Sequence, residues 1–90
     1  MHMDFRRVER IVKGCSNHRR IQIMNLLERQ PDLSVFEISR ELGANFKTIS
    51  EHLRRLAHAG LVLKRNMDKE VEHALSRQGK LILRFLRTLE

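Results

Sequence analysis

The sequence predicts a mostly α fold with one small β-hairpin (α+β), in the order α-α-α-α-β-β-α. Four stretches with helical apolar spacing come first, two short runs typical of strands follow Gly60, and another apolar helical stretch comes last. The 90 residues include one proline and four glycines, and no stretch has the composition of a linker. We therefore expect a single domain over residues 1–90.

The charge of the chain favours an anionic partner. Lys and Arg number 18 against 11 Asp and Glu, so the net charge is +7, and nucleic acid is the commonest partner of small basic domains. Residues 1–27 and 45–80 each carry a net charge of +4, whereas residues 28–44 carry −2. The binding surface should therefore not be centred on the middle segment. A charge that serves only solubility is the alternative.

Composition and motifs exclude several other protein classes. No apolar run approaches the roughly 18 residues of a membrane span, and the charged N-terminus lacks the apolar region of a signal peptide. The single cysteine, Cys15, excludes an intrachain disulfide and suits a reducing compartment. The short chain contains no Gly-rich phosphate loop, metal-hydrolase motif or nucleophile–base pattern. We expect a cytoplasmic, nucleoid-associated protein without membrane contact, enzymatic activity or cofactor.

Apolar spacing and capping residues predict the first two helices. The first spans residues 4–14, with an apolar face opposite basic residues, and Gly14 is expected to end it. Asn17 is a good N-cap for the second helix, which runs to about Arg29. Because the apolar residues of the second helix cover more than one face, we expect it to lie in the core.

The next two helices carry the clearest start and stop signals. Ser34 and Glu37 form a capping box, in which the Ser34 oxygen accepts from the Glu37 amide and Glu37 reaches back. Gly43 is expected to end this helix, and Asn45 to cap a fourth helix that reaches about residue 59. The inward-facing apolar residues of the fourth helix are Ile49, Leu53 and Leu56.

The spacing of apolar residues changes after Gly60. Residues 61–65 and 70–75 are typical of two short strands, with a turn at residues 66–69. Ser76 is then expected to cap a last helix over about residues 77–89.

Helices joined by a short connection, followed by a basic hairpin, indicate a winged helix-turn-helix. The helix-turn-helix covers residues 34–59 and the wing covers residues 61–75. Neither feature is specific alone, but their order and charge pattern together favour a DNA-binding domain.

The outward face of the fourth helix is the candidate DNA reader. A recognition helix enters the major groove and brings side chains to the edges of the bases. Lysine and arginine can donate to guanine, glutamate can accept from cytosine N4, and an aromatic ring can touch a thymine methyl. The predicted base-reading residues are Phe46, Lys47, Ser50, Glu51 and Arg54. A solvated helix face is the alternative, against which an exposed phenylalanine beside a lysine argues.

A second set of residues is predicted to contact backbone phosphates from the fourth helix and the wing. Its members are Asn45, Thr48, His52, Arg55, Lys64, Arg65 and Lys69. Charges on the wing also prevent edge-to-edge aggregation, which is the alternative explanation for them. Asp68 and Glu70 reduce the positive charge of the wing, so we do not expect it to be the main anchor.

Three segments resemble the ArsR/SmtB family of winged-helix repressors, and the resemblance covers nearly the whole chain. Residues 17–27 resemble the second-helix pattern that usually begins D-P-T-R, with Asn17 and His18 replacing its first two residues. Residues 43–53 (GANFKTISEHL) are similar to the recognition segment G-L-S-Q-S-T-V-S-H-H-L, and residues 54–62 (RRLAHAGLV) to K-x-L-x-x-A-G-L-V. The resemblance implies base contacts by Phe46, Lys47, Ser50 and Glu51, of which Phe46 and Glu51 are unusual in the family.

The metal-binding residues of the family are missing. Metal-responsive members carry E-L-C-V-C-D-L at the third helix, whereas residues 32–38 read DLSVFEI and contain no thiol. A second family site uses Asp and His on the final helix, and residues 77–90 contain neither. We therefore expect no metal. Cys15 and His18, three positions apart, leave a metal- or redox-switched sensor as an alternative, although a lone buried cysteine is commoner.

The terminal helices predict a homodimer. Their apolar residues exceed what a small core can cover, and the resemblance implies the same, since family dimers pair through the first and last helices. The predicted interface consists of Phe5, Val8, Ile11 and Val12 together with Ile82, Phe85, Leu86 and Leu89. The alternative is that both helices only close the core of the monomer.

Together these features predict a homodimeric transcriptional regulator that reads double-stranded DNA. We expect a repressor at an inverted-repeat operator. The alternative of a different class is a winged-helix module that binds protein or RNA and reads no DNA bases.

Overall fold

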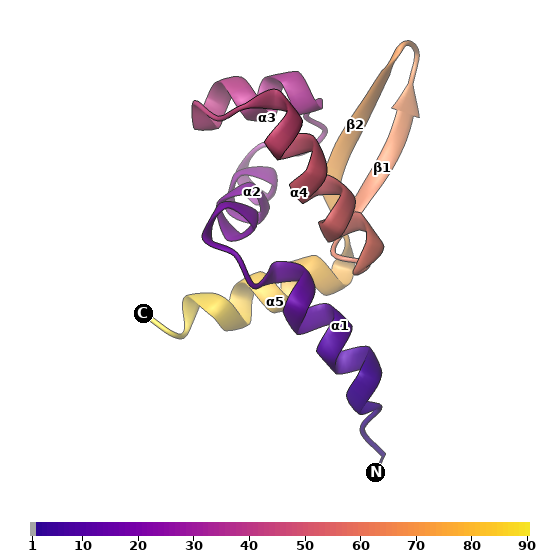
Figure 1. The fold of residues 1–90 in the computed structure, drawn as a ribbon, viewed down its shortest axis with the longest axis vertical. Helices are drawn as coiled ribbons and strands as arrows, with labels where there is room; N and C mark the ends of the chain where they lie inside the picture. The colour runs from indigo at the N-terminus through magenta and orange to yellow at the C-terminus, as the bar shows by residue number, and fades with distance from the viewer. Residues whose placement is uncertain (1) are drawn as a thin grey trace.

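The structure is a computed structural model that describes residues 2–90 (Figure 1). The elements follow the predicted order α-α-α-α-β-β-α, and the fold is a winged helix-turn-helix. They are α1 (Phe5–Cys15), α2 (His18–Arg29), α3 (Val35–Leu42), α4 (Phe46–His58), β1 (Val62–Met67), β2 (Glu70–Leu75) and α5 (Arg77–Arg87).

Side-chain caps begin the helices where the sequence predicts them. Each cap accepts from a backbone amide of the first turn, a bond that contributes about 1 kcal/mol. The Asn17 side chain accepts from the amides of Arg19 and Arg20. The Ser34 side chain accepts from the Glu37 amide, Asn45 from the Thr48 amide and Ser76 from the Gly79 amide. The capping box at α3 is complete, and Gly43 ends that helix with a left-handed φ of 61°. The predicted starts and stop around the helix-turn-helix are thus confirmed.

The end of α1 differs from the prediction. Gly14 does not stop the helix, which continues to Cys15. A Cβ at Gly14 would lie 2.3 Å from Cβ of Ala59, so this glycine lets α1 pass closely over the end of α4. The prediction took a packing glycine for a terminating one.

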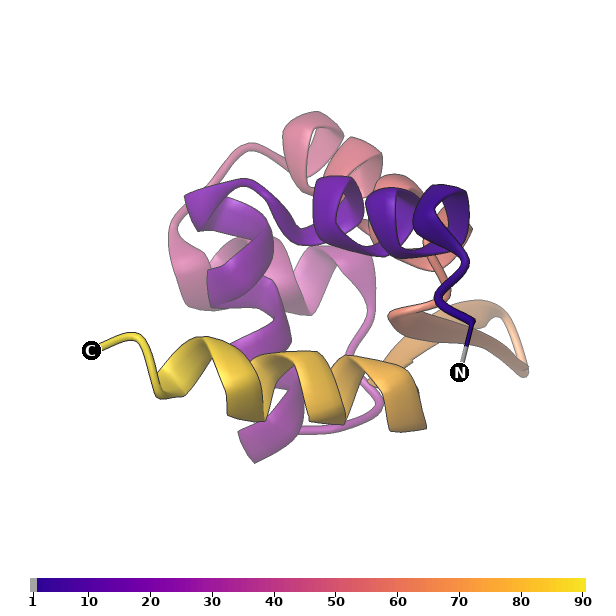
Figure 2. The same ribbon diagram turned by 90° about the horizontal axis from the view of Figure 1, so that it is seen from below.

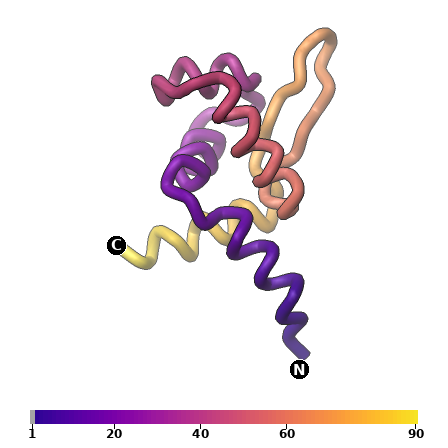
Figure 3. The backbone as a smooth tube through the Cα atoms, viewed as in Figure 1, coloured from indigo at the N-terminus to yellow at the C-terminus, as the bar shows by residue number. Residues whose placement is uncertain are grey.

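The hairpin is longer than predicted and its turn is shorter. Six residue pairs join β1 and β2, from Val62 opposite Leu75 to Met67 opposite Glu70. The turn is therefore confined to Asp68 and Lys69, and Asp68 adopts a positive φ of 54°. Figure 3 shows the hairpin extending away from the helices. Two additional strand residues carry the wing further out than the turn prediction implied.

The core is centred on α2, as its apolar pattern predicts. Ile23, Met24, Leu26 and Leu27 are fully buried, each contributing roughly 1.5–3 kcal/mol by leaving water. They pack with buried residues of every other helix and of the hairpin. This packing holds α3 and α4 in their relative orientation, which positions the outer face of α4.

The terminal helices lie on one side of the molecule. In Figure 2, α1 and α5 lie nearest the viewer, with α3 and α4 behind them. Helix α5 ends at Arg87, so Leu89 lies beyond the helix that was expected to include it. No helix within residues 2–90 combines the length and apolar character needed to cross a membrane.

Candidate nucleic-acid interface

Helix α4 separates a buried face from an exposed one. Ile49, Leu53 and Leu56 are buried in the core. The predicted base-reading residues all lie on the exposed side, and the Phe46 side chain remains 54% exposed. These exposed residues are Phe46, Lys47, Ser50, Glu51 and Arg54. The structure thus brings the predicted set together on one uncovered surface, which we call the α4 outer face.

Glu51 is exposed on the α4 outer face and is hydrogen-bonded to two arginines. Its Oε1 accepts from Arg54 Nη2 at 2.6 Å and from Arg55 Nε at 3.2 Å, and its Oε2 accepts from Arg54 Nε at 3.0 Å. Hydrogen bonds from Arg54 and then Arg55 lower the pKa of Glu51 to about 2. The carboxylate is therefore ionised at neutral pH, and both of its oxygens already have donors.

His52 is half-buried and faces α2 rather than open solvent. Arg20 Nε donates to His52 Nδ1 at 3.1 Å, so Nδ1 carries no proton and the imidazole is neutral. Burial lowers the pKa of His52, and the charges of Arg20 and Arg19 lower it further. Among the predicted phosphate contacts on α4, Thr48 and Arg55 are exposed, whereas His52 has this intramolecular partner. No signal in the sequence could have identified Arg20 as the partner of His52, because the two residues are 32 positions apart.

The basic residues of the wing are exposed. Lys69 lies in the turn, Lys64 lies near the root opposite His73, and Arg65 lies between them. Arg65 Nη1 also lies 3.5 Å from Asp32 Oδ1, in the loop before α3. This exposed ion pair is a contact between the wing and the loop before α3 that the sequence did not suggest.

His73 anchors the root of the wing. It is 2% exposed, and its Nδ1 lies 2.9 Å from the Leu33 carbonyl oxygen. Backbone hydrogen bonds between Leu33 and His73 form an isolated antiparallel bridge, which pairs the segment before α3 with β2. Burial lowers the pKa of His73, with the charge of Lys64 contributing in the same direction, so a neutral imidazole donates from Nδ1 to the carbonyl.

The predicted dimer residues divide into exposed and buried groups. Ile11 is only 9% exposed and packs in the core, and Ile82 and Leu86 are partly buried against it. The others remain exposed, and Leu81, absent from the predicted set, joins them. The exposed residues are Phe5, Val8, Val12, Leu81, Phe85 and Leu89. The four-residue spacing of Leu81 and Phe85 is the signal that could have identified Leu81.

Cys15 is positioned as a core residue. Burial raises the pKa of its thiol, and Sγ donates to the Val12 carbonyl at 3.4 Å. A thiol that stays protonated is a poor nucleophile and a poor metal ligand. Within residues 2–90, no three His, Cys, Asp or Glu side chains are grouped so that they could hold a metal ion.

Comparisons with known proteins agree with this geometry. Residues 17–64 match the family model described as bacterial regulatory protein, arsR family. HlyU from Vibrio cholerae is 31% identical with a TM-score of 0.83, over 99% of this chain and 97% of that one. HlyU from Vibrio vulnificus is 32% identical with a TM-score of 0.75, over 91% of this chain and 85% of that one. The homodimeric winged helix-turn-helix DNA-binding domain Mb0332 from Mycobacterium bovis is 26% identical with a TM-score of 0.85, over 98% of this chain and 86% of that one. Comparison with curated proteins gives no match.

Proposed function

The chain belongs to the arsR family of bacterial regulatory proteins, and from this membership we propose how it regulates transcription. It acts as a homodimer that binds double-stranded DNA sequence-specifically, and it represses transcription from an inverted-repeat operator. The observation that carries the proposal is the α4 outer face, where the base-reading set lies together and uncovered.

The geometry of α4 supports major-groove reading. Phe46, Lys47 and Ser50 lie in the N-terminal half of the helix, the part that approaches base edges in helix-turn-helix proteins. Lys47 can donate to guanine, Ser50 can donate or accept, and the Phe46 ring can contact a thymine methyl. Arg54, one turn further along, can donate to a guanine or a phosphate. These contacts differ in the base they favour, so together they would select a sequence.

The phosphate contacts supply affinity without sequence preference. Thr48 and Arg55 on α4, with Lys64 and Lys69 on the wing, present exposed polar groups beside the α4 outer face. Each neutralised phosphate releases counterions, so binding should weaken steeply with salt. Asn45 is engaged as the α4 cap, and His52, Arg55 and Arg65 have the partners described above, so their contribution depends on whether DNA displaces those bonds.

Dimerisation is supported by the uncovered apolar residues of α1 and α5. A groove of about 450 Å³ between α2 and α5 continues this surface and is lined in part by Ile21, Leu83, Leu86 and Leu89. The neighbour Mb0332 is a homodimeric domain of the same fold. A two-fold dimer would present two α4 helices roughly 34–36 Å apart, or a multiple of that distance, which matches an inverted repeat.

We infer repression because a dimer bound across two half-sites can obstruct polymerase. No metal switches this protein in our proposal. Ser34 and Phe36 stand where metal-responsive members of the family carry cysteines, and the Ser34 hydroxyl is already engaged as the α3 cap.

Selection from a random duplex pool tests the function. The purified protein is expected to enrich an imperfect inverted repeat, and its affinity for that repeat should fall linearly with the logarithm of salt concentration. A selected motif without two-fold symmetry would contradict the dimeric mode. Failure to enrich any motif, or tighter binding to single-stranded RNA than to duplex DNA, would contradict DNA reading and favour the protein- or RNA-binding alternative.

A further inference from the structure

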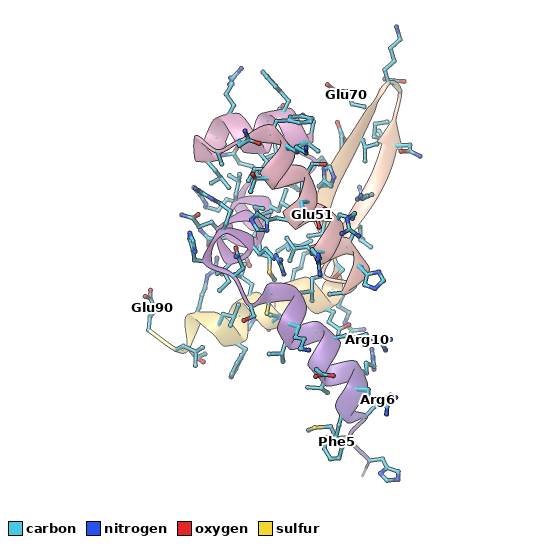
Figure 4. All side chains as sticks on the ribbon, in the orientation of Figure 1. Phe5, Arg6, Arg10, Glu51, Glu70 and Glu90 are labelled. Atoms are coloured by element: carbon cyan, nitrogen blue, oxygen red, sulfur yellow. The ribbon has the colours of Figure 1, made fainter. Side chains whose placement is uncertain are left out.

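Glu51 is the only acidic residue of α4, and it is placed among the residues that would approach DNA. Figure 4 shows it in the middle of the helix, on the face turned toward the viewer. A carboxylate in this position is repelled by phosphates and weakens DNA binding, so its presence there calls for a specific function. Direct acceptance from cytosine N4 is one such function. The contacts of Glu51 indicate a different one.

Both oxygens of Glu51 are occupied by arginine donors. Arg54 forms a two-pronged contact, with Nη2 donating to Oε1 at 2.6 Å and Nε donating to Oε2 at 3.0 Å. Arg55 Nε adds a third bond to Oε1 at 3.2 Å. A single exposed ion pair holds a side chain weakly, but a forked geometry within a network of three groups restricts it more strongly. Reading cytosine through Glu51 would require these bonds to break.

The fork fixes Arg54 without using all of its donors. Arg54 binds Glu51 through the Nε–Nη2 edge of its guanidinium, which leaves the Nη1 end for another partner. An arginine that is already oriented loses less side-chain entropy when it binds a guanine edge or a phosphate. Because these hydrogen bonds lower the pKa of Glu51 to about 2, its carboxylate is ionised at neutral pH and can accept from Arg54 there.

Resting on the proposed function, we propose that Glu51 is a positioning and specificity-determining residue. It orients Arg54 for one base and does not contact a base itself. Its negative charge also offsets part of the charge of Arg54 and Arg55, which lowers the affinity of the helix for DNA of any sequence. Glu51 therefore favours the operator in two ways, by ordering the contact that recognises it and by weakening the competition from other sequences.

Two variants of Glu51 test the proposal. Glu51→Gln keeps the shape of the side chain but removes its charge, and Glu51→Ala removes both. Because all partners of Glu51 are on the exposed side of the same helix, both variants are expected to fold. Glu9→Gln is the matched control, since Glu9 is an exposed acid paired with Lys13 within α1, at 3.4 Å, outside the helix-turn-helix.

The measurement is duplex selection for each variant, followed by titration of the wild-type motif and a scrambled duplex at several salt concentrations. For both Glu51 variants we expect several-fold tighter binding to the scrambled duplex and a selectivity ratio lower by about tenfold. The base position that loses preference should be the one lost by Arg54→Ala. The double variant Glu51→Ala, Arg54→Ala should lose no further position. Glu9→Gln should keep the wild-type motif and ratio.

Three outcomes would overturn the inference, and they are distinguishable. If the wild type selects a motif but Glu51→Ala and Arg54→Ala relax different positions additively, Glu51 reads a base directly and only this inference fails. If Glu51→Gln retains full selectivity, the charge of Glu51 has no role in specificity. If the wild type selects no motif, the proposed function fails, and this inference with it.

Discussion

Arg20 Nε donates a hydrogen bond to His52 Nδ1 over 3.1 Å, joining α2 to the middle of α4. The Nη1 group of the same guanidinium donates to the carbonyls of Lys13 and Gly14, at 3.3 and 3.2 Å. Both carbonyls lie in the last turn of α1; that of Lys13 also accepts from the Ser16 amide, whereas Arg20 is the donor to that of Gly14. One side chain therefore connects a helix of the expected dimer surface to the candidate recognition helix.

Arg20→Ala is expected to destabilise the domain by about 1–2 kcal/mol, because it removes the hydrogen bond to His52 and leaves the Gly14 carbonyl without its donor. Urea unfolding followed by circular dichroism measures the change. Arg19→Ala is the matched control, since the Arg19 side chain bonds only to exposed Gln22 and its loss should change stability by less than about 0.5 kcal/mol. Equal effects of the two substitutions would contradict the bridging role of Arg20.

Stability should fall as the solution is acidified below neutrality. The pKa values of His52 and His73 are lowered from 6.5 in the folded chain, so the unfolded chain binds more protons in this range. The stability that these two histidines contribute is fully present above pH 6.5. It is lost as the pH falls from 6.5 through their pKa values in the folded chain. Urea midpoints at about pH 7.5 and about pH 5.5 measure the loss.

Substitution of the buried histidine separates this effect from general acid sensitivity. His73→Gln should lower stability at neutral pH but flatten its dependence on pH, because the titrating group is gone. His58→Gln, which removes an exposed imidazole at the end of α4, serves as the control. An unchanged pH dependence in His73→Gln would exclude His73 as its source.

Phe85→Asp is expected to give a folded monomer. The Phe85 side chain is 59% exposed on α5, so a charge there would disrupt an apolar interface without entering the core. Leu86→Asp should instead impair folding, since Leu86 packs against the core. Sedimentation at micromolar concentration distinguishes these states, with Leu63→Asp on the wing as a dimeric control. A wild-type protein that is monomeric under these conditions would refute the dimer.

Zinc, cadmium and arsenite are expected to change neither the melting temperature nor DNA affinity at stoichiometric concentration. The only thiol, that of Cys15, is buried, and residues 32–38 contain no cysteine. Thermal unfolding and duplex titration with each ion check this. A tight one-to-one site that is lost in Cys15→Ser or His18→Ala would show that the prediction is wrong.

Ser50→Ala and Arg65→Ala should affect DNA binding differently. Loss of a base contact at Ser50 should cost about 1–3 kcal/mol on the operator and relax one position. Loss of a phosphate contact at Arg65 should weaken all sequences alike and reduce the salt slope by about one. Asp32→Asn, which keeps the positive φ of 66° while releasing Arg65, is the matched comparison and should not weaken binding. Loss of motif preference in Arg65→Ala would contradict a purely backbone role.

Local chemistry made most of the fold predictable. The caps at Asn17, Ser34, Asn45 and Ser76 bond to amides two or three residues away, so their partners are visible in the sequence. The same holds for the α4 outer face, since helical periodicity alone separates Ile49 and Leu53 from Ser50. The turn of the wing was placed too broadly, because Asn66 and Met67 have no local signal against a turn, and cross-strand pairing extends the strand through them.

Contacts between distant residues were decided only by the tertiary structure. Arg20 meets His52, Arg65 meets Asp32, and Leu33 pairs with His73 across a separation of 40 positions, none of which follows a local rule. Apolar periodicity could assign Phe5 and Ile11 to one face of α1, but packing against the rest of the domain decided that Ile11 is buried and Phe5 is not. The sequence by itself determined which helices form and which residues share a face, because those depend on bonds within one turn. Which faces stay uncovered depends on how α2 packs in the core, and that required the folded chain.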